Sequence, residues 1–266
     1  MPPPPPRAIT ARQLRVFDLE TTGLDTATDR VVQFGTATFR NGALLHVEDV
    51  LVNPCTPIPM EASSVHGIYD SDVEDAPTFG LIGDTVALMV SQSEEQVLCG
   101  YNALRFDVPL LNAEFERHCY AARIDPDRVL DPFVWLMYHR RDWPSRRLAV
   151  AAERFDCPLV AAHRASADAE ATGHILHRMM EQGLVPDDVE EALAVQQRLL
   201  LALQQETAVY GRFLYIDRDH HTLLRIGFGK HAGSLLRDVP KSYLRWMLQK
   251  IPDLPALVAS EIRVYA

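Results

Sequence analysis

The stretch VFDLETTGLD, residues 16–25, decides the fold. It reads as the end of a buried strand followed by a turn. Side chains alternate along a strand, so Phe17 and Leu19 can point into a core while Asp18 and Glu20 share the opposite face. Adjacent carboxylates repel each other, and one interpretation is a polar strand edge that simply faces water. The apolar strand before the pair favours the other interpretation, in which oxygen-ligated Mg²⁺ or Mn²⁺ removes the repulsion.

The surrounding sequence predicts further strands and helices that complete a sheet. Residues 30–52 read as two strands joined at Asn41-Gly42, which is a strong hairpin signal. Residues 53–68 are interrupted by prolines, which predicts a long loop. The remaining predicted elements are helices at 78–91 and 107–122, strands at 96–102 and 128–133, mainly helices over 132–205, strands within 211–230 and a helix at 242–250. This order predicts an α/β fold with a mixed sheet, in which ligand sites lie at strand ends.

The composition is that of an ordinary globular chain. Of the 266 residues, 47% are hydrophobic and 23% are charged, and no apolar run approaches the roughly 18–20 residues that span a bilayer. The prolines of MPPPPPRAIT cannot enter a helix or a central strand, so residues 1–9 are expected to form a disordered tail and not a signal peptide. The four cysteines form no C-x-x-C pair, which indicates free thiols in a reducing cytoplasm.

Charge is distributed unevenly along the chain. The formal net charge is -10, yet residues 211–266 hold nine Lys/Arg against five Asp/Glu, and they include all three lysines. An acidic body with a basic C-terminal segment indicates contact with a polyanion. Because the predicted elements also change from helices back to strands at residue 211, we expect a main domain over residues 10–205 and a small α+β domain over residues 206–266.

Two further segments carry candidate site residues near helix starts. Asp107 follows a predicted strand and precedes Pro109, so it is a helix cap, a metal ligand or both. Further along the chain, His163 lies five residues before Asp168, which falls in the first turn of a predicted helix. Alone, Asp168 would fit the helix dipole and His163 a surface loop. Their spacing lets one group bind a metal ion while the other faces a bound water molecule.

The motifs VFDLETTGL, NALRFD and HRASAD, at residues 16–24, 102–107 and 163–168, together resemble those of the DEDDh 3′-to-5′ exonucleases, the proofreading-exonuclease superfamily. The resemblance spans residues 14–180, and no motif position departs from the pattern. It implies an RNase H-like mixed five-stranded sheet flanked by helices, two bound divalent ions (Mg²⁺ or Mn²⁺) and a histidine general base, His163. The metal ligands that it implies are Asp18, Glu20, Asp107 and Asp168.

The implied site would hydrolyse phosphodiester bonds by metal-ion chemistry. Two ions about 3.5–4 Å apart activate a water molecule and stabilise the departing 3′-oxygen. The charge of the ions balances that of the four carboxylates, so the acidic cluster does not simply repel the substrate. Histidine titrates near neutral pH, which suits a base that takes the proton of the water.

The resemblance also implies contacts with the terminal nucleotide. In this family they come from the residues after the first acidic pair and from the Val-His-Gly-Ile loop, with further residues supporting the site. Turn formation, loop packing and core packing are the alternative roles of these side chains. The residues concerned are Thr21, Leu24, His66, Asn102 and Phe106. An apolar or aromatic side chain that stacks on a base is largely indifferent to the base's identity.

The C-terminal segment resembles the small C-terminal domain of exonuclease X-type enzymes. The resemblance rests on FGKHAG at residues 228–233 and YLRW at residues 243–246. The alternative is a hairpin with a glycine-rich turn packed on a short helix. Exposed glycine amides beside basic side chains suit a phosphate backbone, so we expect this domain to bind DNA through Lys230, Arg237 and Lys241.

The sequence therefore predicts a cytoplasmic, metal-dependent 3′-to-5′ exonuclease. It would release 5′-mononucleotides from single-stranded or mismatched 3′ ends of DNA, in repair or replication fidelity. An exoribonuclease for short RNA or tRNA ends is an alternative, because the motifs do not show whether a 2′-hydroxyl is accepted. A protein that binds nucleic-acid ends without cutting them is the alternative of another class. No membrane partner is expected, and association with a polymerase stays open.

Overall fold

The computed structural model describes residues 7–157, 159–160 and 162–266, which divide into two compact units. The first unit contains residues 7–133 and 147–196, and the second contains residues 134–146 and 197–266. The division differs from the expected boundary at 205/206, because residues 134–146 and the second half of a long helix group with the C-terminal segment.

The first unit includes the chain from residue 7 onward. Arg7 pairs with Asp188 at 2.7 Å, Ala8 forms a β-bridge with Asp188, and Ile9 is fully buried. The predicted disordered tail therefore does not include residues 7–9, and its residues 1–6 lie outside the described part of the chain.

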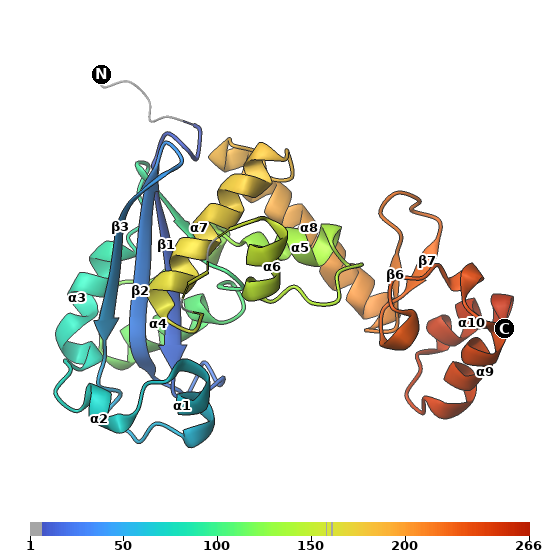
Figure 1. The fold of residues 1–266 in the computed structure, drawn as a ribbon, viewed down its shortest axis with the longest axis horizontal. Helices are drawn as coiled ribbons and strands as arrows, with labels where there is room; N and C mark the ends of the chain where they lie inside the picture. The colour runs from blue at the N-terminus through green and yellow to red at the C-terminus, as the bar shows by residue number, and fades with distance from the viewer. Residues whose placement is uncertain (1–6, 158, 161) are drawn as a thin grey trace. The chain divides into compact units, whose positions relative to one another are not determined.

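A mixed five-stranded sheet in the order β3-β2-β1-β4-β5 forms the centre of the first unit (Figure 1). β1 pairs antiparallel with β2 and parallel with β4. The hairpin between β2 and β3 turns at Asn41 and Gly42, both with positive φ, as a tight hairpin turn requires. The predicted α/β sheet is thus confirmed. Its strands are β1 (Gln13–Thr21), β2 (Val31–Arg40), β3 (Ala43–Leu51), β4 (Gln96–Cys99) and β5 (Val129–Leu130).

Helices pack on both faces of this sheet. α7 (Ala165–Glu181) contacts β1, β2 and β3, whereas α3 (Phe79–Met89) and α4 (Asp107–Arg117) share a hydrophobic core with Phe17 and Leu19 (Figure 1). Because strand side chains alternate, Asp18 and Glu20 lie on the face opposite Phe17 and Leu19. Burial of the apolar face thereby determines which face carries the acidic pair.

The segment predicted as a long loop contains a helix. α1 (Met60–His66) begins directly after Pro59, because the prolines of this segment all precede the helix. The other helices are α2 (Asp70–Val73), η1 (Pro126–Arg128), α5 (Pro132–His139), α6 (Leu148–Arg154) and α8 (Val189–Tyr210). Among the described residues, none of the helices is both long enough and apolar enough to cross a membrane.

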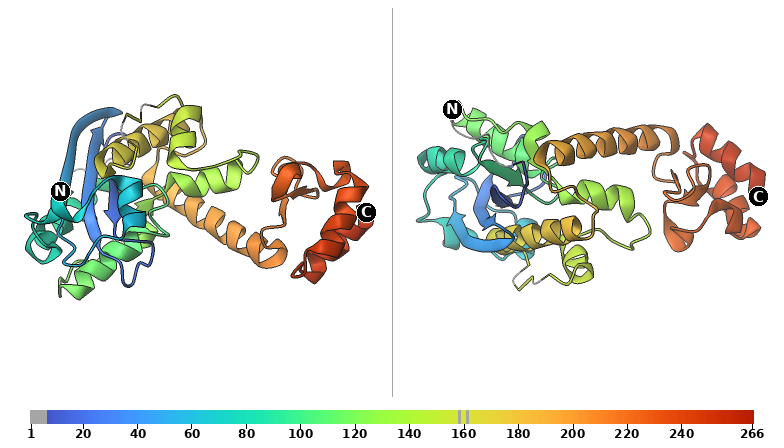
Figure 2. Two further views of the ribbon diagram at one scale, coloured as in Figure 1. Left: turned by 60° about the horizontal axis from the view of Figure 1, so that its bottom comes forward. Right: turned by 90° about the horizontal axis from the view of Figure 1, so that it is seen from above.

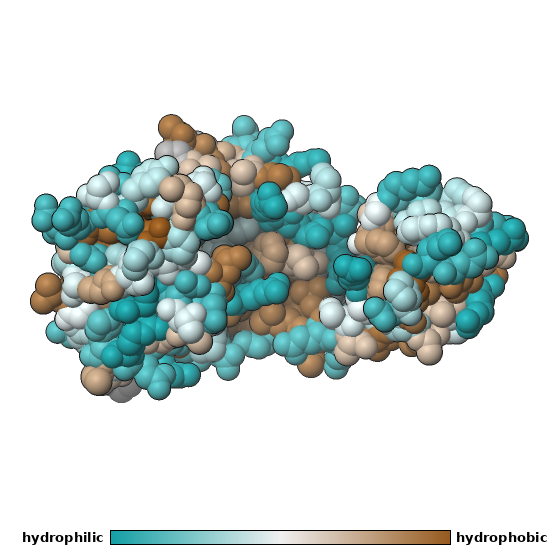
Figure 3. All heavy atoms as spheres, turned by 90° about the horizontal axis from the view of Figure 1, so that it is seen from below, coloured by the Kyte–Doolittle hydropathy of each residue, from teal (hydrophilic) through white to brown (hydrophobic). Residues whose placement is uncertain are grey.

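The second unit has a small hydrophobic core of its own. Two antiparallel strands, β6 (Leu214–Ile216) and β7 (Leu224–Ile226), are followed by η2 (Gly229–His231), η3 (Leu236–Asp238), α9 (Lys241–Lys250) and α10 (Ala256–Tyr265) (Figure 2). Leu244, Met247 and Ile262 are fully buried in this core. Hydrophilic and hydrophobic side chains are interspersed on the face of the unit that Figure 3 shows. The helix α10 was not predicted, whereas the strands and α9 were.

Candidate active site

The C-terminal end of β1 carries the first acidic pair. Glu20 is buried and Asp18 is half-buried, and the pairing of β1 with β2 shifts register directly after Glu20. Such an irregularity at a strand end redirects the side chains that follow it. The sequence predicted this placement, because it depends only on the alternation of side chains along β1.

Asp107 is the first residue of α4. The loop that precedes it is held by the buried carboxylate of Asp131. Asp131 accepts hydrogen bonds from the backbone N–H groups of Asn102 (2.8 Å), Leu104 (3.2 Å) and Phe133 (3.0 Å). Asn102 has a left-handed backbone (φ 59°) that this anchoring stabilises. Sequence reasoning missed Asp131, because RVLDPF was predicted as a strand over residues 128–133, whereas β5 ends at Leu130.

The start of α7 is anchored to the sheet by side chains from two strands. Asp49 on β3 accepts hydrogen bonds from Ser166 N (2.9 Å) and Ser166 Oγ (2.6 Å), and from Arg164 Nε (2.6 Å). Gln33 on β2 accepts one from Ala165 N (3.0 Å). These bonds satisfy N–H groups that a helix start leaves unpaired. Sequence reasoning missed both acceptors, because they lie more than a hundred residues from the groups they bind.

Gly35 lets α7 approach β2 closely. A Cβ atom at this position would lie 2.2 Å from both Ala165 C and Ser166 N. Gly35 also pairs with Asp18 across the β1–β2 ladder. The absence of a side chain at Gly35 therefore brings the start of α7 next to the acidic pair.

This approach gathers residues from separate motifs into one cluster. Glu20, His163 and Asp168 each offer a ligand atom, and these atoms lie within 4.8 Å of one another. His163 is exposed, and its backbone N–H donates to Asp168 Oδ2 at 3.2 Å. Asp18 and Asp107 lie near this group, because the charges of Asp107, Asp168 and Glu20 act on Asp18, and that of Asp107 also acts on Glu20. The structure thus brings together three of the five predicted catalytic residues, and it places Asp18 and Asp107 within electrostatic range of the carboxylates among them.

Crowding and burial make ionisation of the cluster unfavourable without a cation. Burial, followed by the charges of Asp168 and Asp107, raises the pKa of Glu20 to about 8. Burial also raises the pKa of Asp107 to about 7 and that of Asp168 to about 6. Burial and the charges of Asp107, Asp168 and Glu20 raise the pKa of Asp18 well above its ordinary value.

The donor set fits a hard divalent cation. Asp168 Oδ1 is buried and has no hydrogen-bond partner among the described residues. Carboxylate oxygens are the ligands that Mg²⁺ and Mn²⁺ prefer, and a cation would favour the ionised forms that burial disfavours. The residues present therefore fit a divalent metal site that includes Glu20 and Asp168.

A pocket of about 550 Å³ adjoins the cluster. Four of the five predicted substrate-contact residues line it, and Asn102 is not among the lining residues. Leu24 is 85% exposed at its rim, and Phe106 also packs against the core. His66 Nδ1 accepts a hydrogen bond from Ile68 N (3.0 Å), and burial lowers the pKa of the His66 ring. The four lining residues are Thr21, Leu24, His66 and Phe106.

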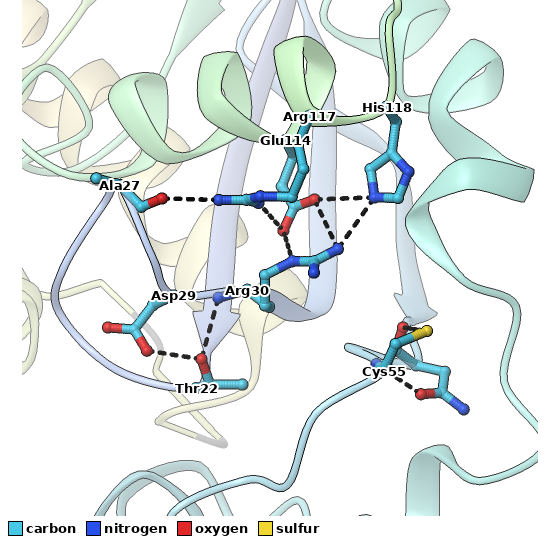
Figure 4. Close-up of polar contacts among 9 residues, drawn as sticks. Thr22, Ala27, Asp29, Arg30, Cys55, Glu114, Arg117 and His118 are labelled. Atoms are coloured by element: carbon cyan, nitrogen blue, oxygen red, sulfur yellow. Dashed lines mark hydrogen bonds and ion pairs between the residues drawn. The ribbon is translucent and has the colours of Figure 1, made fainter.

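A buried ion-pair network connects the loop carrying Leu24 to α4 (Figure 4). Glu114 is fully buried and accepts from Arg30 Nε at 2.7 Å, and Arg117 Nη1 lies 2.9 Å from the same carboxylate oxygen. Arg117 also donates to Ala27 O at 2.9 Å, and Thr22 Oγ1 accepts from Arg30 N at 3.0 Å. The loop after the first acidic pair is therefore attached to the helix that begins with Asp107.

The three residues predicted to contact the phosphate backbone of DNA lie in the second unit. Lys230 is in η2, Arg237 is in η3 and Lys241 is the first residue of α9. All three side chains are exposed.

Comparison with known proteins is consistent with this geometry. The sequence model of a family described as exonuclease matches residues 16–176. DNA polymerase III PolC-type from Caldanaerobacter subterraneus is 30% identical over 167 residues, which cover 63% of this chain and 11% of that protein. The corresponding protein of Oceanobacillus iheyensis is 25% identical over 248 residues, which cover 93% of this chain and 16% of that protein. The chain thus spans only a small part of the length of these relatives.

Solved structures of exonucleases share the fold. The zinc-bound complex of E. coli exonuclease I with single-stranded DNA matches with a TM-score of 0.56 and 20% identity, covering 73% of this chain and 43% of that one. Exonuclease X in complex with 5′-overhanging duplex DNA matches with a TM-score of 0.51 and 21% identity, covering 69% of this chain and 99% of that one. Since the family model covers more than half of the chain and the motif residues converge on one cluster, the protein belongs to the exonuclease family, within the DEDD-type 3′-to-5′ exonuclease superfamily.

Proposed function

We propose that the protein is a metal-dependent exonuclease that removes nucleotides from the 3′ end of DNA. The observation that carries this proposal is the convergence of ligand atoms of Glu20, His163 and Asp168 within 4.8 Å of one another, with Asp18 and Asp107 in electrostatic range. Paired carboxylates, a histidine and an adjoining pocket together supply what phosphodiester hydrolysis requires.

Each residue of the cluster has a proposed role. Asp18, Glu20, Asp107 and Asp168 would hold two divalent ions, Mg²⁺ or Mn²⁺. When bound, such ions supply an activated water molecule and stabilise charge on the leaving oxygen. His163 would accept the proton of that water, and its exposure gives it access to the solvent that must take the proton away. The product would be a 5′-mononucleotide.

The pocket beside the cluster is the proposed site of the terminal nucleotide. Its volume of about 550 Å³ lies within the range of small-ligand sites. Leu24 and Phe106 would contact the base, while Thr21 and His66 would contact polar groups of the nucleotide. We propose Asn102 as an indirect contributor, because its backbone is fixed by Asp131 and precedes Asp107.

We propose DNA as the substrate, in repair or in replication fidelity. Structures of E. coli exonuclease I contain single-stranded DNA, and the PolC-type relatives are named as DNA polymerases. Action within the cytoplasm is supported by four cysteines that are free thiols. Association with a polymerase is a further possibility suggested by the PolC-type relatives. RNA with a 3′ end is the second candidate substrate.

The second unit is proposed as an auxiliary DNA-binding module. Its exposed Lys230, Arg237 and Lys241 are suited to phosphate contacts. Its basic C-terminal segment would offset repulsion between DNA and the otherwise acidic chain.

Digestion of 5′-labelled oligonucleotides tests the proposed function. Single-stranded DNA, a mismatched duplex and RNA of the same sequence are incubated with Mg²⁺, with Mn²⁺ and with EDTA. We expect a ladder of products that retain the 5′ label and shorten from the 3′ end, with divalent metal only. Asp18→Ala is the control and should produce no ladder. Equal digestion by Asp18→Ala, or digestion in EDTA, would refute the proposed function.

A further inference from the structure

The fold brings together the two C-terminal motifs that the proposed catalytic site does not use. FGKHAG contributes Gly229 and Lys230 through η2, and YLRW contributes Tyr243 and Trp246 through α9. Lys230 Nζ lies 5.9 Å from the centre of the Tyr243 ring. A Cβ atom at Gly229 would lie 2.8 Å from the Tyr243 hydroxyl, so the lack of a side chain there allows this approach.

Tyr243 and Trp246 form a stacked pair along one side of α9. Their ring centres are 5.2 Å apart and the ring planes are inclined by 28°. His231 contacts the Tyr243 ring edge to face, with ring centres 4.5 Å apart. Trp246 is 45% exposed, whereas Leu244 and Met247 of the same helix are fully buried. Leu244 and Met247 therefore hold α9 against the core, on which Tyr243 also packs, and the exposed aromatic surface belongs mainly to Trp246.

Positive charge surrounds this aromatic pair. Lys250 lies one helical turn beyond Trp246, and Lys230 lies beside Tyr243. Residues 229–250 contain five Lys/Arg and a single Asp, and α9 itself contains no acidic residue. Base stacking on aromatic side chains combined with cations for the phosphates is the way in which proteins bind unpaired nucleotides.

We propose that Tyr243 and Trp246, flanked by Lys230 and Lys250, form a stacking platform for the bases of single-stranded nucleic acid. The inference rests on the proposed exonuclease function and specifies its substrate: the strand must carry unpaired nucleotides at the platform. A duplex presents phosphates but no free base faces, so it would contact only the lysines. Stacking accepts every base, which suits an enzyme that removes nucleotides regardless of sequence.

Binding of a 5′-labelled single strand and of a blunt duplex of equal length to the full chain tests the platform. Fluorescence anisotropy is measured in EDTA, so that no divalent ion supports cleavage. We expect Trp246→Ala to weaken single-strand binding about tenfold or more while duplex binding changes little. Trp246→Phe should retain most of the affinity. Lys230→Gln and Lys250→Gln should each weaken binding of both ligands, and each should lower the salt slope by about 0.7 for the single strand and about 0.9 for the duplex.

Leu257→Ala on α10 is the matched control, because Leu257 is 47% exposed and also lies in the second unit. Single-strand affinity of Trp246→Ala equal to that of the parent would overturn the platform. An equal loss of affinity for single strand and duplex in Trp246→Ala would also overturn it. So would equally strong competition by polyglutamate, a polyanion that has no bases to stack. Digestion of a 3′ end by the parent, measured in parallel with Mn²⁺, reports on the proposed function separately. If the parent digests DNA and Trp246→Ala binds the single strand normally, only the platform is refuted. If the parent does not digest DNA and Trp246→Ala binds the single strand weakly, only the exonuclease function is refuted.

Discussion

His163 reaches the acidic cluster with a left-handed backbone (φ 66°). Few residues adopt this conformation readily, and histidine is among the more tolerant ones. The backbone N–H of His163 donates to Asp168 Oδ2, so the carboxylate of Asp168 fixes the backbone at this position. The side chain is then free to face solvent.

Replacement of His163 by alanine tests its role as a base. We expect the rate of DNA hydrolysis to fall by roughly 10²–10⁴-fold, because proton transfer by a positioned side chain contributes about that much. Metal affinity should change little, since four carboxylates remain. The measurement is single-turnover digestion together with Mn²⁺ titration by calorimetry. A large loss of Mn²⁺ affinity would instead make His163 a metal ligand, and an unchanged rate would remove it from the mechanism.

The raised pKa values predict how stability depends on pH and metal. Free carboxyl groups titrate near pH 4 in an unfolded chain, whereas the pKa of Asp168 is about 6 and that of Glu20 about 8 in the folded protein. Between these values the folded state binds more protons, so the free energy of unfolding in EDTA should fall as pH rises from about 4 to about 8.

Divalent metal should reverse this trend, because it binds the ionised carboxylates. At a metal concentration roughly a hundredfold above Kd, the gain is about 3 kcal/mol, and it should be larger at the upper end of the pH range. Urea unfolding with EDTA and with Mn²⁺ at both ends of the range measures the effect. Asp168→Asn should lose most of the metal-dependent gain. The same gain in this variant and the parent would contradict the site.

At the scale of elements, the site depends on how α7 and α4 attach to the sheet. Asp49 and Gln33 fix the start of α7, and Asp131 fixes the loop before α4. None of these residues was predicted, because each bonds to a group that is distant in sequence or to a backbone whose conformation the sequence does not reveal. In contrast, the alternation in β1 and the turn at Asn41-Gly42 are local, and they were predicted correctly.

Local sequence also explains why two of the helices, α1 and α10, were not predicted. α1 and α10 follow Pro59 and Pro255; the prolines before α1 were read as marks of a loop, and no element was predicted after residue 250. A proline ends a helix that precedes it, but it is well tolerated just before or at the start of a new one. Periodicity over the seven residues of α1 is too short to indicate a helix by itself.

Asp49→Ala tests the attachment of α7. The loss of the bonds to Ser166 and Arg164 should lower the free energy of unfolding by about 1–2 kcal/mol, as the loss of a helix cap does. The fall in activity, expressed as a free energy of activation, should exceed this loss of stability, because His163 and Asp168 lie at the released start of α7. Urea unfolding and kcat for a labelled oligonucleotide provide the two measurements. Ser166→Ala removes only one of the three bonds and should have a smaller effect on both; an equal effect would contradict the role of Asp49.

At the scale of the whole molecule, an acidic chain is proposed to bind a polyanion. The formal net charge is -10, and only the C-terminal segment has an excess of basic residues. The sequence predicted the basic segment and its separation from the catalytic core. It did not predict that residues 134–146 group with the second unit, because contact between distant segments leaves no local pattern.

Replacement by glutamine of the three residues predicted to contact the DNA phosphates tests whether the basic C-terminal segment binds DNA. In the variant Lys230→Gln, Arg237→Gln, Lys241→Gln, the slope of log affinity against log salt should decrease by about two, since single-strand contacts contribute about 0.7 each. DNA-binding titrations at several salt concentrations give the slope. Arg40→Gln with Arg123→Gln, two exposed positions of the first unit, is the control. An unchanged slope in the triple variant would place the phosphate contacts elsewhere.

The central position of β1 affects how the protein fluctuates. Residues 14–16 of β1 are paired with β2 on one side and β4 on the other. Amide hydrogens in doubly flanked strands exchange with deuterium only when large parts of a molecule open, whereas exposed loops exchange in their native state. Protection should therefore be highest just before Asp18 and low around His163. β1, which carries Asp18 and Glu20, would then stay folded during local opening of the loop around His163. The proposed base would leave the cluster and return to it while the carboxylates of β1 stay in place.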